Sequence, residues 1–426
     1  MIYYLKKSAK NMNFSPWITA IIIMILKTTV EPASILKEII TQKDPSLAQT
    51  SNSENYILDF VGLVKQHGYP VEEHQVITED GYVLIFYRIS DSPRSNSTQQ
   101  NKPVVFLQHG VYAALEVWVI LGPEHSLAFL LADAGFDVWL GTVRGTLYGQ
   151  LNRQFSMEDR EFWQFSYHEH AIYDLPALID YVLDYTKSKK LNYIGYSMGT
   201  TMAYVLLSTK PSYNEKFRLV LSLAPIAYWV KASAPLLIKL LFRATMDFKP
   251  VLEAEGIYGI VPQSKLIGLL SKMCSEKSIL QFICTAIIFI FFGNDPVQLS
   301  SVATRKLSEY YPGGGSFQVA YHYIQNFNAE KFQAYDYGYE GNIKRYNQKT
   351  PPEYDLKKVS APVAIIYGRN DALASIESVL ELSKRLPNVS IVEAVPYKYF
   401  SHADFIIAAD VRKLLNDRIT NLLKLS

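Results

Sequence analysis

Residues 191–199 read LNYIGYSMG, and this stretch decides the fold. Leu191–Ile194 is a short apolar run typical of a buried strand, and Thr200–Ser208 has the pattern of a helix. Ser197 stands between them, with a glycine two positions away on either side. Such flanking glycines suit a sharp strand-to-helix turn, because larger side chains would collide with the neighbouring backbone. The pattern therefore predicts a turn that raises the Ser197 hydroxyl above the end of a sheet.

Short apolar runs alternate with helix-length amphipathic stretches on both sides of this turn. The alternation is typical of a largely parallel sheet covered by helices on both faces, so we expect an α/β fold. A hairpin turning at Glu79–Gly81 precedes it. The expected strands are Val104–Gln108, Asp137–Thr142, Leu191–Gly195, Leu219–Ala224, Val363–Tyr367 and Ser390–Val395, and the expected helices include Ser126–Ala134 and Tyr173–Lys187.

Two later loops carry the groups that would activate a serine hydroxyl. A serine needs a base to remove its proton, and the base needs an orienting acid. Asp371 follows the strand Val363–Tyr367, and His402 follows the strand Ser390–Val395. Both loops leave the carboxyl ends of strands, the same edge as Ser197, and the order Ser, Asp, His is that of α/β-hydrolases. We therefore expect Ser197, Asp371 and His402 to form a catalytic triad.

An anionic tetrahedral intermediate also requires hydrogen-bond donors. The early strand Val104–Gln108 ends in a His109-Gly110 turn, so the backbone N–H groups of Val111 and Met198 are the expected oxyanion hole. His109 itself is interpreted as a turn residue. The triplet 168–170, His-Glu-His, has no third ligand at a sensible spacing, so we expect no metal site. The predicted chemistry needs no cofactor.

The alternation of strands and helices breaks between residues 232 and 346. This stretch is rich in large apolar residues and mostly helical in pattern, and its run Ile279–Phe292 is too short to span a membrane. The run is either a buried cap helix or a surface that contacts lipid. We expect a mainly helical cap at 232–346, inserted into a core formed by 34–231 and 347–426.

The N-terminus has the features of a secretory signal. Lys6, Lys7 and Lys10 precede the apolar run Trp17–Leu26, which is followed by small or polar residues. We predict a signal peptide at 1–33, with a retained signal anchor as the alternative, and no membrane span once the signal is removed. The route implies a secreted or lysosomal protein.

Glycosylation sequons and cysteines fit the same route. Asn96 and Asn388 each begin an Asn-x-Ser/Thr sequon. Cys274 and Cys284 are the two cysteines of the chain, and they form either one disulfide or a pair of buried thiols. The formal net charge of +2 gives no basic field for nucleic acid.

Many short segments resemble the acid lipase family, which includes the gastric and lysosomal acid lipases and insect relatives. The resemblance runs from about Asn55 to the C-terminus. The matching segments are Gly68–Pro70, Thr78–Tyr82, Gln108–Gly110, Ala134–Gly141, Arg144–Gly145, Glu161–Trp163, Tyr173–Pro176, Tyr335–Gly338, Thr350–Leu356 and Gly368–Asp371.

The resemblance assigns the nucleophile to Ser197, the acid to Asp371 and the base to His402. It assigns the oxyanion donors to Val111 and Met198, and a cap disulfide to Cys274 and Cys284. Two departures concern the nucleophile motif, where Tyr196 and Met198 replace the family's His and Gln. A third is Val111, where the family has Leu. Because the donors are backbone groups, these changes bear on the pocket and the substrate rather than on the chemistry.

The resemblance implies a lipase that cleaves triacylglycerol or cholesteryl esters through an acyl-enzyme, at a lipid–water interface. One alternative is a carboxylesterase for short or signal-type esters. The other is a lipid-binding protein without catalysis, which the presence of all three triad residues argues against.

Overall fold

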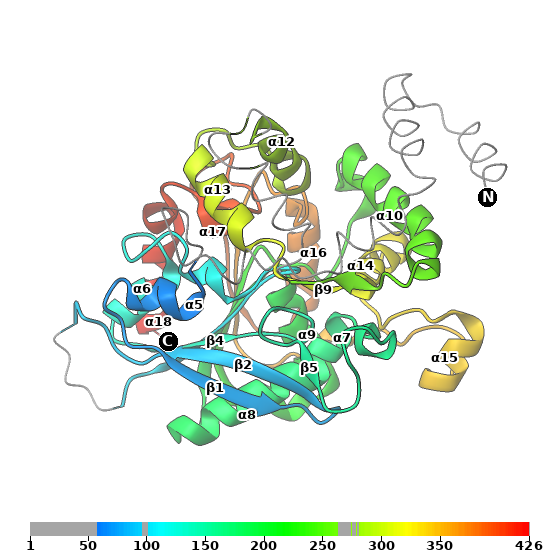
Figure 1. Cartoon of the computed structure of the whole chain (residues 1–426), viewed down its shortest axis with the longest axis horizontal. Coiled ribbons are helices and arrows are strands. Elements are labelled where there is room, and N and C mark those ends of the chain that lie inside the picture. Colours follow the sequence, from blue (N-terminus) through cyan, green and yellow to red (C-terminus); the bar gives the residue numbers. More distant parts are fainter. Residues whose placement is uncertain (1–57, 96–100, 263–273, 275–277, 279–280, 426) are drawn as a thin grey trace.

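The computed structural model describes residues 58–95, 101–262, 274, 278 and 281–425 (Figure 1). The predicted signal peptide and Asn96 lie outside these residues. Among the described helices, none combines the length and the apolar character needed to cross a bilayer.

A nine-stranded sheet, counted over the described residues, forms the centre of the fold. Its order is β1-β2-β4-β3-β6-β7-β10-β11, and β5 pairs with β2. The first two strands form the predicted antiparallel hairpin, β2 is antiparallel to β4, and the pairs from β4 to β11 are parallel. The strands are β1 (Glu72–Ile77), β2 (Tyr82–Ile89), β3 (Val104–Gln108), β4 (Asp137–Gly141), β5 (Leu151–Asn152), β6 (Leu191–Tyr196), β7 (Phe217–Leu223), β10 (Val363–Tyr367) and β11 (Val389–Ala394).

Helices cover both faces of this sheet, as expected from the alternation. α8 and α9 pack on each other and on the strands. α6 packs on β2 and β4, and α18 packs on α6. The central strands β3, β4 and β6 are buried at every position, because helices exclude water from both of their faces. The helices of the core are α5 (Phe60–Lys65), α6 (Leu127–Asp133), α7 (Tyr167–Glu169), α8 (Leu175–Thr186), α9 (Met198–Thr209), α16 (Ile376–Arg385), α17 (Asp404–Ile407) and α18 (Asp417–Leu425).

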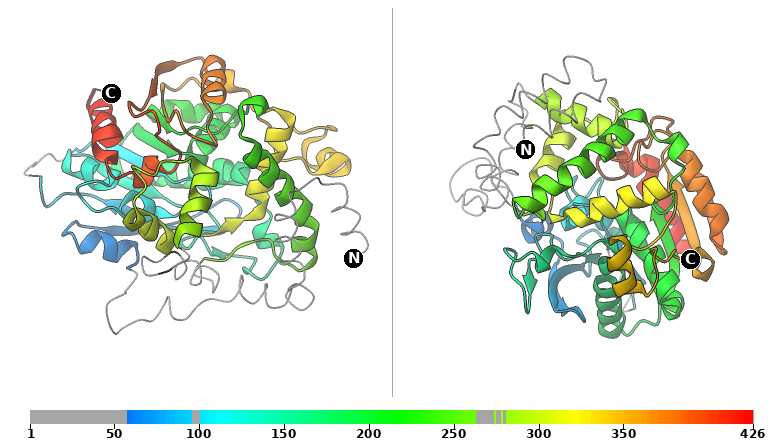
Figure 2. Two further views of the ribbon diagram at one scale, coloured as in Figure 1. Left: turned by 90° about the horizontal axis from the view of Figure 1, so that it is seen from above. Right: turned by 90° about the vertical axis from the view of Figure 1, so that its right-hand side faces the viewer.

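The segment 232–346 is mainly helical. Its helices α10, α12, α13 and α14 gather on one side of the molecule, at the top of Figure 1, and α10 lies beside α14 in both views of Figure 2. The elements of this segment are α10 (Leu236–Ala254), β8 (Gly259–Ile260), α12 (Gln281–Phe292), α13 (Ser301–Tyr310), β9 (Gly315–Ser316), α14 (Phe317–Ala329) and α15 (Gly338–Tyr346).

The apolar run that forms α12 is neither fully buried nor fully exposed. Ile290 and Phe291 are exposed, while Ile288, Phe289 and Phe292 are half-buried against the core. One side of α12 therefore packs against the core, and the other is exposed. A helix that is apolar all round gives no sequence signal for which side faces the protein.

Candidate active site

The turn at Ser197 has the geometry that the glycines predict. β6 ends at Tyr196, α9 begins at Met198, and Ser197 between them has φ 52° and ψ −114°. A Cβ on Gly195 would lie 2.7 Å from the carbonyl carbon of Gly199, and a Cβ on Gly199 would lie 2.4 Å from the carbonyl oxygen of Gln108. Side chains at either position would collide with backbone, so the turn requires both glycines.

Hydrogen bonds connect Ser197, His402 and Asp371 in one line. His402 Nδ1 lies 2.7 Å from Asp371 Oδ2, and His402 Nε2 lies 2.9 Å from Ser197 Oγ. A carboxylate oxygen accepts, so Nδ1 carries the proton and Nε2 is free to accept the hydroxyl proton of Ser197. Three residues far apart in the sequence thus meet at the carboxyl edge of the sheet.

Burial and backbone contacts hold Asp371 and His402 in place. The side chains of Asp371 and His402 are almost fully buried. Asp371 Oδ1 accepts from the N–H groups of Leu373 at 2.8 Å and Ala374 at 2.7 Å, which leaves Oδ2 for the imidazole. The backbone N–H of His402 donates to the carbonyl of Phe292 at 2.9 Å, so the loop of the base is tied to the end of α12.

The turn after β3 lies directly beside the nucleophile. A Cβ on Gly110 would be 3.1 Å from the Cβ of Ser197. His109 is buried, and its Nδ1 lies 2.9 Å from the carbonyl oxygen of Gly110. Because a carbonyl only accepts, Nδ1 must donate, and burial lowers the pKa of His109 to about 4. The imidazole is therefore neutral, and Nε2 has no hydrogen-bond partner within the described part of the chain.

This contact orients a candidate oxyanion donor. The carbonyl of Gly110 and the N–H of Val111 belong to one planar trans peptide and point in opposite directions. A hydrogen bond that holds the carbonyl on one side therefore directs the N–H to the other. Met198, the second expected donor, is the first residue of α9, where backbone N–H groups have no partner within the helix.

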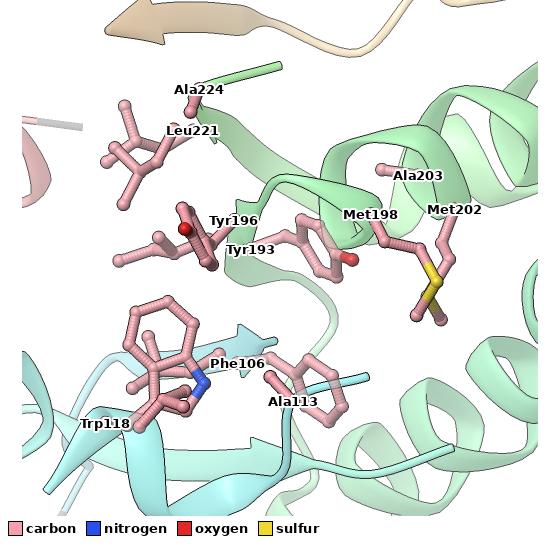
Figure 3. Packing of buried hydrophobic residues seen from close by; sticks show 14 of the residues in the cluster. Phe106, Ala113, Trp118, Tyr193, Tyr196, Met198, Met202, Ala203, Leu221 and Ala224 are labelled. Atoms are coloured by element: carbon pink, nitrogen blue, oxygen red, sulfur yellow. The ribbon is translucent and has the colours of Figure 1, made fainter. Parts of the chain in front are cut away.

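A small apolar cavity adjoins the serine. Its volume is about 40 Å³, and its lining includes Ser197, His402, Phe292 of α12, Leu307 of α13, and Tyr311. Tyr196 lines it as well, and Figure 3 shows that Tyr193 and Tyr196 leave β6 on opposite sides, as the pleat of a strand requires.

The sequence also singled out Cys274, Cys284, Asn388 and His168. Cys274 is buried and disulfide-bonded, whereas the side chain of Cys284 lies outside the described residues. Asn388 is exposed and donates to the carbonyl of Ser360 at 2.9 Å. His168 contacts the hydroxyl of Tyr354 at 2.7 Å, which gives it a partner in the core.

Sequence reasoning missed three contacts around His402. Phe292 stacks on the imidazole, Tyr196 donates its hydroxyl to the His402 carbonyl, and Asp404 accepts from the N–H of Ser401 at 2.5 Å. The spacing of Ser401 and Asp404 could have indicated a local turn. Phe292 is 110 positions from His402 in the sequence, and no local sequence pattern predicts that contact.

Two family models and several relatives match the chain. The model described as a partial α/β-hydrolase lipase region matches residues 60–122, and the α/β-hydrolase fold model matches residues 103–241. Lipase 3 of Drosophila melanogaster is 36% identical, with 84% of this chain and 90% of that protein covered. Human gastric triacylglycerol lipase is 36% identical, covering 84% of this chain and 89% of that protein. Human lysosomal acid lipase/cholesteryl ester hydrolase is 34% identical, covering 85% of this chain and 90% of that protein. The chain therefore belongs to the acid lipase family, within the α/β-hydrolase fold.

Proposed function

We propose that the chain is a serine hydrolase that cleaves carboxylic ester bonds of neutral lipids, triacylglycerols or cholesteryl esters, through an acyl-enzyme. The observation that carries the proposal is the line of hydrogen bonds from Asp371 through His402 to Ser197. The relatives named triacylglycerol lipase and cholesteryl ester hydrolase support the substrate class.

In the first half-reaction Ser197 Oγ attacks the ester carbonyl while His402 Nε2 takes the hydroxyl proton. Asp371 stabilises the imidazolium that forms. The bond to the alcohol breaks, and His402 gives its proton to the departing oxygen. In the second half-reaction water attacks the acyl carbon, His402 takes a proton from the water, and the fatty acid leaves as the Oγ–carbon bond breaks and Oγ regains the proton.

The backbone N–H groups of Val111 and Met198 are proposed to bind the oxyanion in both half-reactions. Two observations support this proposal: a Cβ on Gly110 would lie 3.1 Å from the Ser197 Cβ, and α9 begins immediately after Ser197. The N-terminus of α9 adds a favourable field for negative charge.

Exposed apolar side chains on the cap are proposed to contact the lipid–water interface. On α10, Leu236 is 71% exposed, and Leu237, Leu240, Phe248 and Val251 are also exposed; on the adjacent α12 the same holds for Ile290 and Phe291. The apolar area of such a surface stays in unfavourable contact with water until an apolar partner covers it. A lipid droplet or a micelle is such a partner.

Ser197→Ala tests the chemistry. It should abolish turnover of both a short soluble ester and emulsified triolein and cholesteryl oleate, and it should abolish labelling by a fluorophosphonate. Ser208→Ala, on the same α9 helix, is the matched control, because the Ser208 hydroxyl bonds only the carbonyl of Val205 within the described residues. Substantial turnover by Ser197→Ala would overturn the assignment.

The same panel separates the alternatives. A preference for the emulsified esters supports a lipase, whereas turnover confined to soluble esters indicates a carboxylesterase. Absence of labelling in the native protein would indicate a lipid-binding protein without catalysis.

The double change Leu236→Ser and Leu240→Ser tests the interface. It should lower turnover of emulsified triolein several-fold and leave soluble-ester turnover unchanged. Leu425→Ser is the control, because Leu425 is 84% exposed at the end of α18, away from α10 in Figures 1 and 2. An equal loss on both substrates would argue against the proposed surface.

We further propose that the chain enters the secretory pathway through residues 1–33 and is glycosylated at Asn388 and Asn96, for delivery outside the cell or to the lysosome. The exposure of Asn388 suits a glycan. Glycosidase treatment of the protein from animal cells should increase its gel mobility, and Asn388→Gln should remove part of that shift.

A further inference from the structure

Tyr196 and Ser197 are consecutive residues, and both contact His402. The hydroxyl of Tyr196 donates to the backbone carbonyl of His402 at 2.9 Å, while Ser197 Oγ lies 2.9 Å from His402 Nε2. The end of β6 is therefore joined to the base at two points, one on its backbone and one on its ring.

The Tyr196 side chain is held rigidly. It is buried, its ring meets Trp118 edge-on at 6.5 Å between centroids, and Phe405 lies 6.3 Å away on a third element, α17. Its own ring is 5.2 Å from the imidazole of His402. Burial raises the pKa of Tyr196 well above its ordinary value, so the hydroxyl stays a donor over the whole working range.

The two bonds to His402 differ in how long they last during turnover. Once Ser197 is acylated, Oγ has no proton to donate, so the Ser197–His402 hydrogen bond is lost. His402 must then accept a proton from water at the same place. The Tyr196 bond involves neither the acyl group nor the transferred proton, so it persists through the acyl-enzyme.

We propose that Tyr196 is a positioning residue that keeps His402 in register with the acyl carbon while Ser197 is acylated, and that its main effect is on deacylation. The inference rests on the proposed acyl-enzyme chemistry. Two other contacts, from Asp371 and from the carbonyl of Phe292, also hold His402, but they come from outside β6. Tyr196 is the contact that joins the base to the strand that carries the acyl group.

Tyr196→Phe removes the hydroxyl and keeps the ring. With p-nitrophenyl butyrate, the pre-steady-state burst should keep its rate within about twofold, while the rate of deacylation should fall roughly three- to tenfold, the effect of one lost hydrogen bond. When deacylation limits turnover, kcat and KM then fall together and kcat/KM is preserved. Intact-protein mass spectrometry should find a larger acylated fraction at steady state.

Tyr204→Phe is the matched control. Tyr204 is also a fully buried tyrosine, and its hydroxyl donates to Ser222 Oγ at 2.7 Å, on the side of α9 that faces β7. Tyr204→Phe also removes one buried phenolic oxygen, but one that does not contact His402. The rates of the burst and of deacylation should therefore stay unchanged. Incorporation of 4-fluorophenylalanine at position 196 fills the space of the hydroxyl without a donor, and it should slow deacylation as Phe does if the hydrogen bond, rather than a void, is responsible.

Thermal unfolding of each variant establishes that it is folded. If Tyr196→Phe does not fold, the 4-fluorophenylalanine variant is used for the kinetic test instead. An unchanged deacylation rate, or equal loss of the burst and deacylation rates, would overturn the inference. The proposed function fails separately, if the native protein shows no burst and Ser197→Ala retains turnover.

Discussion

The ring of Phe292 lies face to face with the imidazole of His402, with centroids 5.8 Å apart and planes 7° from parallel. Phe292 ends α12, and its carbonyl also accepts from the N–H of His402. The cavity beside Ser197 has a volume of about 40 Å³, space for a few water molecules at most and far less than a fatty acyl chain needs. The ring of Phe292 is therefore one of the groups that narrow the space beside Ser197.

Phe292→Ala should therefore increase turnover of short soluble esters. Removal of the ring opens space beside His402 while the backbone bond to residue 292 remains. We expect a two- to fivefold rise in kcat/KM for p-nitrophenyl butyrate, measured by steady-state kinetics, and a smaller gain with emulsified triolein. Phe291→Ala is the control for the soluble ester alone, because that neighbouring ring is exposed and belongs to the proposed lipid surface. A fall in soluble-ester turnover by Phe292→Ala would show that the ring supports the base rather than covering it.

Asp371→Asn should lower kcat by roughly 10³–10⁴-fold, because the amide neither stabilises the imidazolium nor fixes the Nδ1–H tautomer. The amide oxygen can still accept from Leu373 and Ala374, so the loop and the melting temperature should change little. Steady-state kinetics and thermal unfolding check the two statements. A loss of less than tenfold would mean that another group orients His402.

A pair of substitutions at His109 separates orientation of the oxyanion hole from packing. Asn places an N–H donor near the position of Nδ1, whereas Leu fills the space without a donor. His109→Leu should lower kcat about tenfold or more, with KM within twofold, because the Gly110 carbonyl then keeps only the 3.3 Å bond from the Ala113 N–H and the Val111 N–H is held less firmly. His109→Asn should recover most of that loss. Equal losses in the two variants would assign the effect to packing alone.

The strands of the core could be predicted from sequence because each is a short apolar run between loops. The expected ranges agree with β3 and β10, and β11 is displaced by one residue. The strand order is different, because it depends on pairings between distant segments. β10 pairs with β7 through Val363 and Val220, which lie on either side of the segment 232–346. Neither strand has a sequence pattern that indicates its partner.

The predicted triad residues meet because each sits where a strand ends, and position along a parallel sheet is readable from sequence. Contacts to backbone atoms are not readable in this way. The acceptor of Tyr196 is the carbonyl of His402, a group that every residue has, so nothing in residues 400–404 distinguishes it. The same holds for the half-buried face of α12, whose apolar residues suit protein and lipid equally.

Asp404 should make the protein less stable as the pH rises. Burial, together with the nearby carboxylate of Asp295, raises the pKa of Asp404 to about 8. Tyr397, whose pKa is raised, stays uncharged beside both carboxyl groups. An unfolded Asp titrates near 4, so between about pH 4 and pH 8 the folded state holds a proton that the unfolded state lacks. This contribution is fully present below pH 4 and is lost as the pH approaches 8, with a slope of about 1.4 kcal/mol per unit.

Asp404→Asn removes this titration and keeps an oxygen that can accept from the N–H of Ser401. The free energy of unfolding, measured in urea at pH 5, 6, 7 and 8, should fall less steeply with pH in the variant than in the native protein. Glu116→Gln is the comparison variant, because burial raises the pKa of Glu116 to about 7. The Glu116 carboxyl, which lies beside Tyr148, therefore also makes the free energy of unfolding fall as the pH rises. If Asp404→Asn leaves the slope unchanged, Asp404 is ionised in the folded protein over this pH range, and the prediction is wrong.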